Sequence, residues 1–269
     1  MTARYTIEGG DAGADRLDVL DRVHGPGTRG LLDRVGLPAG ARCLDVGCGG
    51  GHVSRELARR VGGAGSVVGI DMDAVVIDRA RAATTEAGLE NVEFRTGDAA
   101  DLEPGSFDVA FARFLLSHVG APEVVVAAMV AAVRPGGIVV VEDTDFTGCF
   151  CAPPNAAYDG FVTLYRETLR RRGGNADRGL ELPALLTGAG LTGVGVSTAQ
   201  PCGLEGEVKL MFPLTMARIA DSVVAEGVAT QDEADSLARE LERYCDDPTT
   251  MAANPRVVQS WGRRADATA

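Results

Sequence analysis

Short apolar segments alternate with longer amphipathic ones five times between residues 42 and 142, and this alternation restricts the fold more than any other feature. A short apolar segment bounded by glycine is typical of a buried strand in a parallel sheet. Because parallel strands need a crossover between them, the amphipathic segments are expected to be helices. We therefore predict an α/β fold with a doubly wound, mostly parallel sheet. Its expected strands cover residues 42–46, 66–71, 92–96, 107–112 and 138–142.

The alternation does not extend to the two ends of the chain. Residues 15–32 are expected to form a helix that is interrupted at Gly25-Pro26-Gly27, because glycine and proline break helices. After Asp145 the pattern is mainly helical and predicts only two more strands. The elements expected there are helices within 153–172, 182–189 and 205–244, and strands at 194–198 and 256–262.

These expectations predict how the chain is divided into domains. A helical lead-in precedes a sheet core, and helical insertions form a lid above the carboxyl ends of the strands. The lead-in covers residues 1–40, the core 41–202 and 255–264, and the lid 146–180 and 203–250.

Composition excludes several classes of function. Apolar residues make up 45% of the 269 residues and charged residues 24%, as in an ordinary folded protein. The longest uncharged apolar run, residues 124–133, is too short to span a bilayer. Acidic residues outnumber basic ones by 38 to 26, without a basic patch for phosphates, so neither nucleic acid nor a membrane is an expected partner. With no secretory signal in sight, a cytoplasmic location is expected.

A glycine-rich loop follows the first predicted strand, where a parallel sheet binds its ligand. Glycine stands at positions 47, 49 and 51, but His52 occupies the position where a dinucleotide-binding loop needs its third glycine. Asp45 precedes the loop, and its carboxylate would repel a pyrophosphate and attract a cationic or amino-bearing ligand. A dehydrogenase is therefore the weaker alternative.

The segment 44–51 resembles the first motif of class I S-adenosylmethionine-dependent methyltransferases, of the small-molecule type found in bacteria. The other motifs of that family follow in order, and together they cover roughly residues 40–145. They are Gly69-Ile70-Asp71-Met72-Asp73, Gly97-Asp98-Ala99, residues 107–113 and residues 133–137.

The resemblance implies a Rossmann-like methyltransferase fold and S-adenosylmethionine as the cofactor. It implies that Asp71 accepts hydrogen bonds from the ribose hydroxyls and that Met72 covers one face of the adenine. It also implies that Asp98 accepts a hydrogen bond from the adenine amino group. The remaining cofactor-binding residues that it implies, or that we expect to close the pocket, are Tyr5, Asp45, Gly47, Cys48, Gly49, Gly51, Ala99, Arg113 and Phe114.

The acceptor of the methyl group is expected to be a small hydrophobic or aromatic molecule. His118 is the candidate base or orienting group, because it follows the fourth strand closely; a purely structural histidine is the alternative. No metal site is expected. The candidate substrate-binding residues come from the lid, where helical spacing equally allows them to be core: Phe146, Phe150, Tyr158, Phe212 and Met216.

Two interpretations of function remain open. The first is a small-molecule methyltransferase that acts at oxygen, nitrogen or carbon, and the second is a catalytically silent cofactor-binding or partner-binding protein on the same fold. A pocket that reaches the sulfonium methyl group would favour the first. The sequence is compatible with a monomer or a homodimer.

Overall fold

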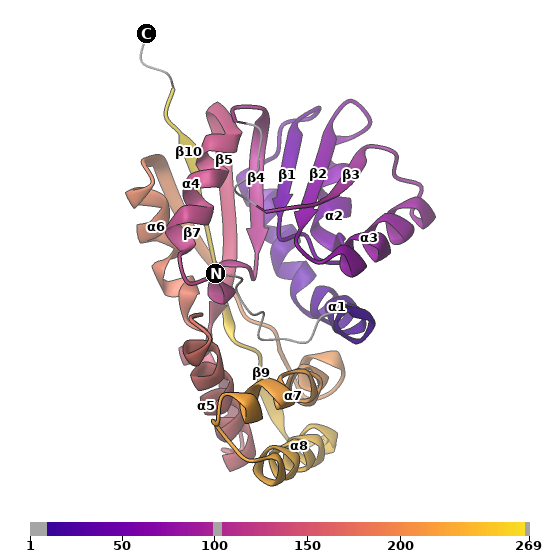
Figure 1. The fold of residues 1–269 in the computed structure, drawn as a ribbon, viewed down its shortest axis with the longest axis vertical. Helices are drawn as coiled ribbons and strands as arrows, with labels where there is room; N and C mark the ends of the chain where they lie inside the picture. The colour runs from indigo at the N-terminus through magenta and orange to yellow at the C-terminus, as the bar shows by residue number, and fades with distance from the viewer. Residues whose placement is uncertain (1–9, 99–103, 267–269) are drawn as a thin grey trace.

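A seven-stranded sheet forms the centre of the computed structural model, which describes residues 10–98 and 104–266. The strand order is β3-β2-β1-β4-β5-β10-β7. The first five strands run parallel, and β10 is antiparallel to both β5 and β7 (Figure 1). The expected α/β fold with a doubly wound, mostly parallel sheet is confirmed. The strands are β1 (Arg42–Val46), β2 (Ser66–Asp71), β3 (Val92–Thr96), β4 (Phe107–Arg113), β5 (Val133–Asp145), β7 (Leu191–Ala199) and β10 (Arg256–Arg264).

Helices cover both faces of this sheet, because successive strand residues point to opposite sides. Cys43 packs with α1 (Gly10–Val35) and α2 (His52–Val61) on one face. Its neighbour Leu44 packs with α4 (Pro122–Ala132) and α6 (Leu182–Gly188) on the other. The helix α3 (Ala74–Glu86) packs against β3 through Ile77 and Phe94. None of the described helices is long and apolar enough to cross a bilayer.

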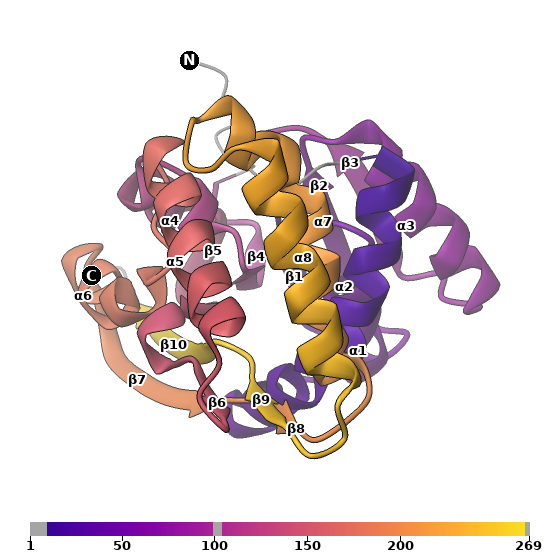
Figure 2. The same ribbon diagram turned by 90° about the horizontal axis from the view of Figure 1, so that it is seen from below.

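A helical lid lies below the carboxyl ends of the parallel strands (Figures 1 and 2). It has its own apolar core, in which aromatic residues of α5 (Ala156–Arg171) meet those of α7 (Glu207–Ala225) and α8 (Gln231–Asp246). A small antiparallel sheet that the sequence did not predict runs beneath them. Its strands lie in the order β6 (Phe150–Ala152), β9 (Met251–Ala253) and β8 (Cys202–Gly203).

The expected interruption of the first helix is wrong, since α1 runs unbroken through Pro26. Proline removes one hydrogen bond from a helix, but packing of the segment compensates for that loss. A Cβ atom at Gly27 would lie only 2.8 Å from the Cβ of Ala199 in β7, so glycine is needed there to let the helix approach the sheet. Close packing, rather than a turn, explains this glycine.

The fifth strand is also longer than expected at both ends, because it begins at Val133, which pairs with Phe107 of β4, and continues past Glu142 to Asp145. Its antiparallel partner explains the extension at the carboxyl end: β10 pairs with it residue by residue, from Arg256 opposite Asp145 to Arg263 opposite Ile138. Strand pairing of this kind depends on a segment more than 100 residues away, which local pattern does not reveal.

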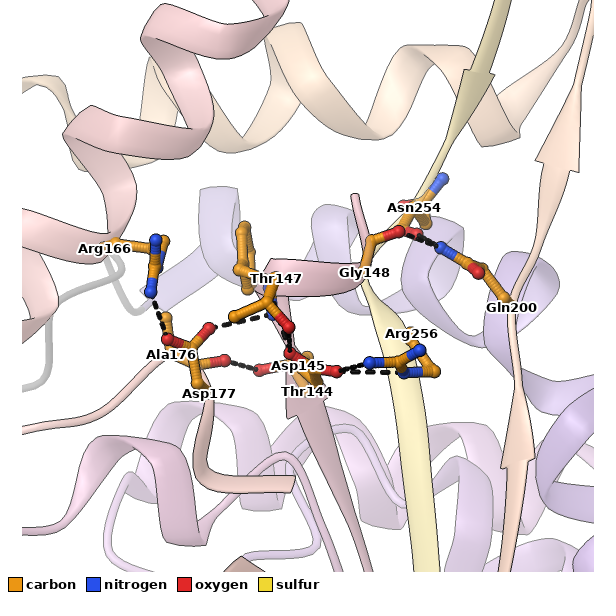
Figure 3. Close-up of polar contacts among 11 residues, drawn as sticks. Thr144, Asp145, Thr147, Gly148, Arg166, Ala176, Asp177, Gln200, Asn254 and Arg256 are labelled. Atoms are coloured by element: carbon orange, nitrogen blue, oxygen red, sulfur yellow. Dashed lines mark hydrogen bonds and ion pairs between the residues drawn. The ribbon is translucent and has the colours of Figure 1, made fainter. Parts of the chain in front are cut away.

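Polar contacts fix the lid to the end of the sheet (Figure 3). The fully buried Asp145 accepts hydrogen bonds from the Arg256 guanidinium, with 2.9 Å between Nε and the carboxylate. Gln200 donates from Nε2 to the carbonyl oxygens of Gly148 (2.7 Å) and Asn254 (3.0 Å). The chain therefore leaves and re-enters the core through bonded, ordered connections.

We expect Asp145→Ala to destabilise the fold by about 2–3 kcal/mol, because it removes charge-assisted bonds at a buried site. Urea unfolding at pH 7 measures this loss. The matched control is Glu207→Ala, which breaks the exposed ion pair with Arg22 and should leave the midpoint nearly unchanged. Equal midpoints for the two variants would contradict the assignment of Asp145 as an anchor.

Candidate active site

A cavity of about 840 Å³ lies between the carboxyl ends of the strands and the lid. Its floor is made by the loops after β1, β2 and β3. The segment after β4 lies beside this floor, at the point where the strand order changes direction. In open α/β sheets this is the position where ligands bind. The helix α1 and the lid helices α5 and α7 provide the remaining walls. We call this space the main cavity.

The glycine loop after β1 forms a bare backbone floor. Gly47 and Gly49 have φ angles of 68° and 49°, which side chains rarely adopt. The amide groups of Gly47 and Cys48 donate to the Ile70 carbonyl at 2.8 and 2.9 Å, so the loop is held against the end of β2. Gly51, by contrast, does not line the cavity. Glycine is needed there for packing, because a Cβ atom at this position would lie 2.6 Å from the Phe94 ring.

Two acidic residues on the floor have different environments. Asp45 is buried and accepts a hydrogen bond of 2.6 Å from Ser54 Oγ, and burial raises its pKa to about 6. Asp71 accepts hydrogen bonds from the backbone amides of Gly49 (2.9 Å) and Asp73 (3.0 Å). Burial raises the pKa of its carboxyl group. Asp71 thus joins the end of β2 to the glycine loop and still faces the cavity.

The side of the cavity beyond Asp71 carries the other residues expected to contact adenine. Met72 lines the rim with 65% of its surface exposed. Asp98 also lines the cavity, from the segment that follows β3. Tyr5 and Ala99 lie outside the described residues.

A polar cluster fastens α1 across the ends of β4 and β5. Arg113 donates to Asp21 at 2.9 Å and to Thr28 at 3.2 Å, so this predicted cofactor residue bonds to the helix as well as lining the cavity. Thr28 in turn donates to the buried Glu142, which also accepts from Gln259 Nε2 at 2.9 Å. The helix is therefore a fixed wall of the site.

One further contact joins α1 to the lid. Arg16 donates from Nε to Thr215 Oγ1 on α7 at 3.2 Å, and both residues line the main cavity. Arg16 therefore lies where it can close the pocket from the N-terminal side. Positive charge from Arg16 and Arg113 thus lies beside the glycine loop.

Two buried histidines line the cavity. His118 ends a short 3-10 turn after β4, and burial, followed by the charge of Arg16, lowers its pKa to about 4. His24 projects from α1, and burial, followed by the charges of Arg113 and Arg16, lowers its pKa to about 3. Both imidazoles are neutral near pH 7. His24 was not among the expected site residues, because the helix break expected beside it favoured a role in capping a loop over a position above the cofactor.

The residues that were expected to bind the substrate lie in three different places. Phe146 and Phe212 line the cavity. Tyr158 and Met216 are buried inside the lid instead, where the Tyr158 hydroxyl donates to the Ala253 carbonyl. Phe150 is half exposed on β6, away from the cavity lining. Four more residues of the lid helices line the cavity: Phe161 and Tyr165 of α5, and Met211 and Thr215 of α7.

Charge is distributed unevenly in the main cavity. Its four acidic lining residues all belong to the floor: Asp45, Asp71, Asp73 and Asp98. The half formed by the lid and the segment after β4 has aromatic, aliphatic, hydroxyl, amide and neutral imidazole groups, and no carboxylate among the described lining residues. One half suits a cation and the other an uncharged or weakly acidic molecule.

Comparison with known proteins defines the class. Residues 37–163 match the sequence model of a family described as "Methyltransferase domain". That segment contains the glycine loop, Asp71, Asp98 and the five parallel strands β1 to β5. We identify it as a class I S-adenosylmethionine-dependent methyltransferase domain, and S-adenosylmethionine is the cofactor of this class.

The chain is similar to curated O-methyltransferases over part of their length. The chain is 40% identical over 103 residues to ubiquinone biosynthesis O-methyltransferase of Neisseria meningitidis and 43% identical over 108 residues to that of Pseudomonas fluorescens. These alignments cover 37% and 39% of this chain, and 42% and 44% of the relatives. The chain therefore matches less than half the length of these relatives.

Solved structures share the fold at low sequence identity. YcgJ from Bacillus subtilis has a TM-score of 0.58 and 16% identity, covering 88% of this chain and 97% of its own. The [4+2]-cyclase SpnF has a TM-score of 0.53 and 22% identity, covering 89% of this chain and 80% of its own. This likeness confirms the Rossmann-like architecture.

We expect His24 and His118 to remain neutral from pH 8 down to about pH 5, because their folded pKa values lie near 3 and 4. Imidazole nitrogen shifts in an NMR titration measure this directly, with His24→Gln and His118→Gln assigning the signals. In the unfolded chain both groups protonate near pH 6.5. The unfolded state therefore binds more protons between pH 6.5 and 4, and these two groups weaken the fold as pH falls through that window. Protonation of either folded imidazole near pH 6.5 would contradict the burial argument.

Proposed function

We propose that this protein transfers a methyl group from S-adenosylmethionine to a hydroxyl oxygen of a small molecule. The observation that carries the proposal is the main cavity, in which an acid-bearing floor adjoins an aromatic half without carboxylates among its described lining residues. The curated relatives are named O-methyltransferases, which supports oxygen as the acceptor atom.

The floor fits the cofactor. Its glycines leave the backbone bare where the methionine and ribose parts would lie, with Cys48 beside them. Asp71 would accept the ribose hydroxyls, and Met72 and Asp98 would contact the adenine. Arg16 and Arg113 would provide positive charge near the carboxylate of the methionine part of the cofactor. When bound, the cofactor supplies an electrophilic methyl group on a sulfonium centre.

The residues of the other half would bind and activate the acceptor. Phe146, Phe161 and Phe212 give it apolar walls that exclude water and hold an aromatic or aliphatic molecule in line. His118 is neutral, so one of its nitrogens can accept the proton of the acceptor hydroxyl. With a pKa of about 4 it is a weak base, which favours an acidic hydroxyl such as a phenol over an alkyl alcohol.

We expect Asp71→Ala to weaken binding of S-adenosylhomocysteine by about 10- to 100-fold, because charge-assisted hydrogen bonds contribute roughly 1.5–3 kcal/mol. Isothermal titration calorimetry on cofactor-stripped protein measures this. The matched control is Asp78→Ala, an exposed aspartate of α3 that pairs with Arg81 and lies outside the cavity. Equal binding by both variants, or no binding by the wild type, would refute the assignment of the floor.

We expect His118→Asn to lower kcat for a phenolic acceptor by about 100-fold, the usual contribution of a general base. Release of S-adenosylhomocysteine, followed by chromatography, measures turnover. The wild-type rate should fall below about pH 5 as the imidazole is protonated, and this acid limb should disappear in the variant. Affinity for S-adenosylhomocysteine should stay within twofold of wild type in the variant. An unchanged kcat would remove His118 from the reaction, and cofactor binding without turnover of any phenol would favour a catalytically silent protein.

A further inference from the structure

A second, smaller cavity of about 230 Å³ lies behind the main one; we call it the side cavity. It is lined by the middle of α1 and by the adjoining ends of β5, β7 and β10, and it is partly open. Much of its wall is apolar, from Val23, Pro26, Ala199, Pro201 and Val257. Among the described residues, Phe114 is the one expected cofactor or substrate residue that lines this space.

Two rings separate the side cavity from the main cavity. His24 and Phe114 are the residues that line both. Their ring centroids are 5.2 Å apart and their planes meet edge to face at 76°. The partition is therefore a single layer of side chains.

The backbone at Phe114 is in an uncommon state. Its φ angle is 54°, a value that is unusual for a bulky residue and stores roughly 1–3 kcal/mol. A hydrogen bond of 2.9 Å from its amide to the Glu142 carbonyl holds this conformation. The side chain is thereby directed to the boundary between the two cavities, in place of continuing the line of β4.

The polar groups of the side cavity leave no place for a charged ligand. The Glu142 carboxylate accepts from Thr28 and from Gln259, so its oxygens already have partners. Gln259 also donates to the Gly27 carbonyl at 3.1 Å. An anion would be repelled by Glu142, and a cation would have to displace these bonds. An uncharged apolar group meets neither obstacle.

The volume sets the size of the group. An apolar cavity of about 150 Å³ is enough to bind benzene. At about 30 Å³ for each small heavy-atom group, the volume that one water molecule occupies in the liquid, 230 Å³ holds about eight such groups. The side cavity is therefore suited to a compact substituent and closed to a long chain.

We propose that the side cavity is a second compartment of the acceptor site, which takes a compact, uncharged apolar substituent of the acceptor when the Phe114 ring turns aside. This inference rests on the proposed function, since it assumes that the acceptor occupies the lid half of the main cavity. It makes Phe114 and His24 the residues that determine how large an acceptor can be.

The test measures binding of 4-alkylphenols, from 4-methylphenol to 4-dodecylphenol, to protein saturated with S-adenosylhomocysteine. In the wild type, affinity should rise by about fourfold for each added methylene, the effect of burying one such group. The rise should stop after about eight carbons, when the side cavity is full. Prior titration with S-adenosylhomocysteine alone tests the proposed function separately.

Val257→Phe fills the side cavity and should abolish the rise in affinity with alkyl chain length. 4-Methylphenol should still bind this variant as it binds the wild type. The matched control is Val258→Phe, because the neighbouring residue on β10 points to the opposite face, near Gly179, and does not line the cavity. That variant should keep the gain.

A crystal structure of the wild type with S-adenosylhomocysteine and 4-hexylphenol keeps the proposal testable if Val257→Phe fails to fold. An alkyl chain between Val23 and Val257, with the Phe114 ring displaced, would support the proposal. A chain that stays in the main cavity would overturn it, as would an affinity that is independent of chain length or an equal loss of the gain in both variants.

Discussion

The polar cluster of Asp21, Arg113, Thr28 and Glu142 is the constraint on which the site depends. It bonds α1 to the ends of β4 and β5, in a region where an open parallel sheet would otherwise expose its carboxyl edge to solvent. With α1 fixed, the strand ends gain a wall opposite the lid, and the bond from Arg16 to Thr215 joins that wall to α7. Both cavities exist because this helix is held in place.

The floor and the lid present different chemical groups to the main cavity. The floor binds by backbone and by carboxylates that are themselves bonded, as at Asp71, so its shape is set before any ligand arrives. The lid contributes side chains of aromatic and aliphatic type, whose fit to a ligand depends on shape and excluded water. Buried neutral histidines lie between these two halves. Such an arrangement keeps the reacting atoms in a dry environment, where fixed dipoles act strongly.

The sequence predicted the parts of the fold that are local and periodic. The strands β1 to β4 and the loops that follow them were placed within a residue, because apolar runs and glycines mark them directly. It failed where contacts between distant segments decide. Gly-Pro-Gly predicts a break, yet packing of Gly27 on Ala199 keeps α1 continuous, and the carboxyl end of β5 depends on its pairing with β10. Aromatic residues of the lid share one helical pattern, so sequence alone could not separate Phe212, on the cavity, from Tyr158, in the lid core.

The lid is built from pieces inserted after β5 and after β7, whereas the floor comes from residues 42–98 as one stretch of chain. The lid joins the sheet through bonded junctions such as Asp145 with Arg256, at a distance along the chain from the floor. The two halves can consequently diverge at different rates. On the proposed function, substitutions in the lid would change which molecule is accepted and leave the floor unchanged, so descendants of one ancestor could acquire new acceptors without passing through a form that has lost its cofactor.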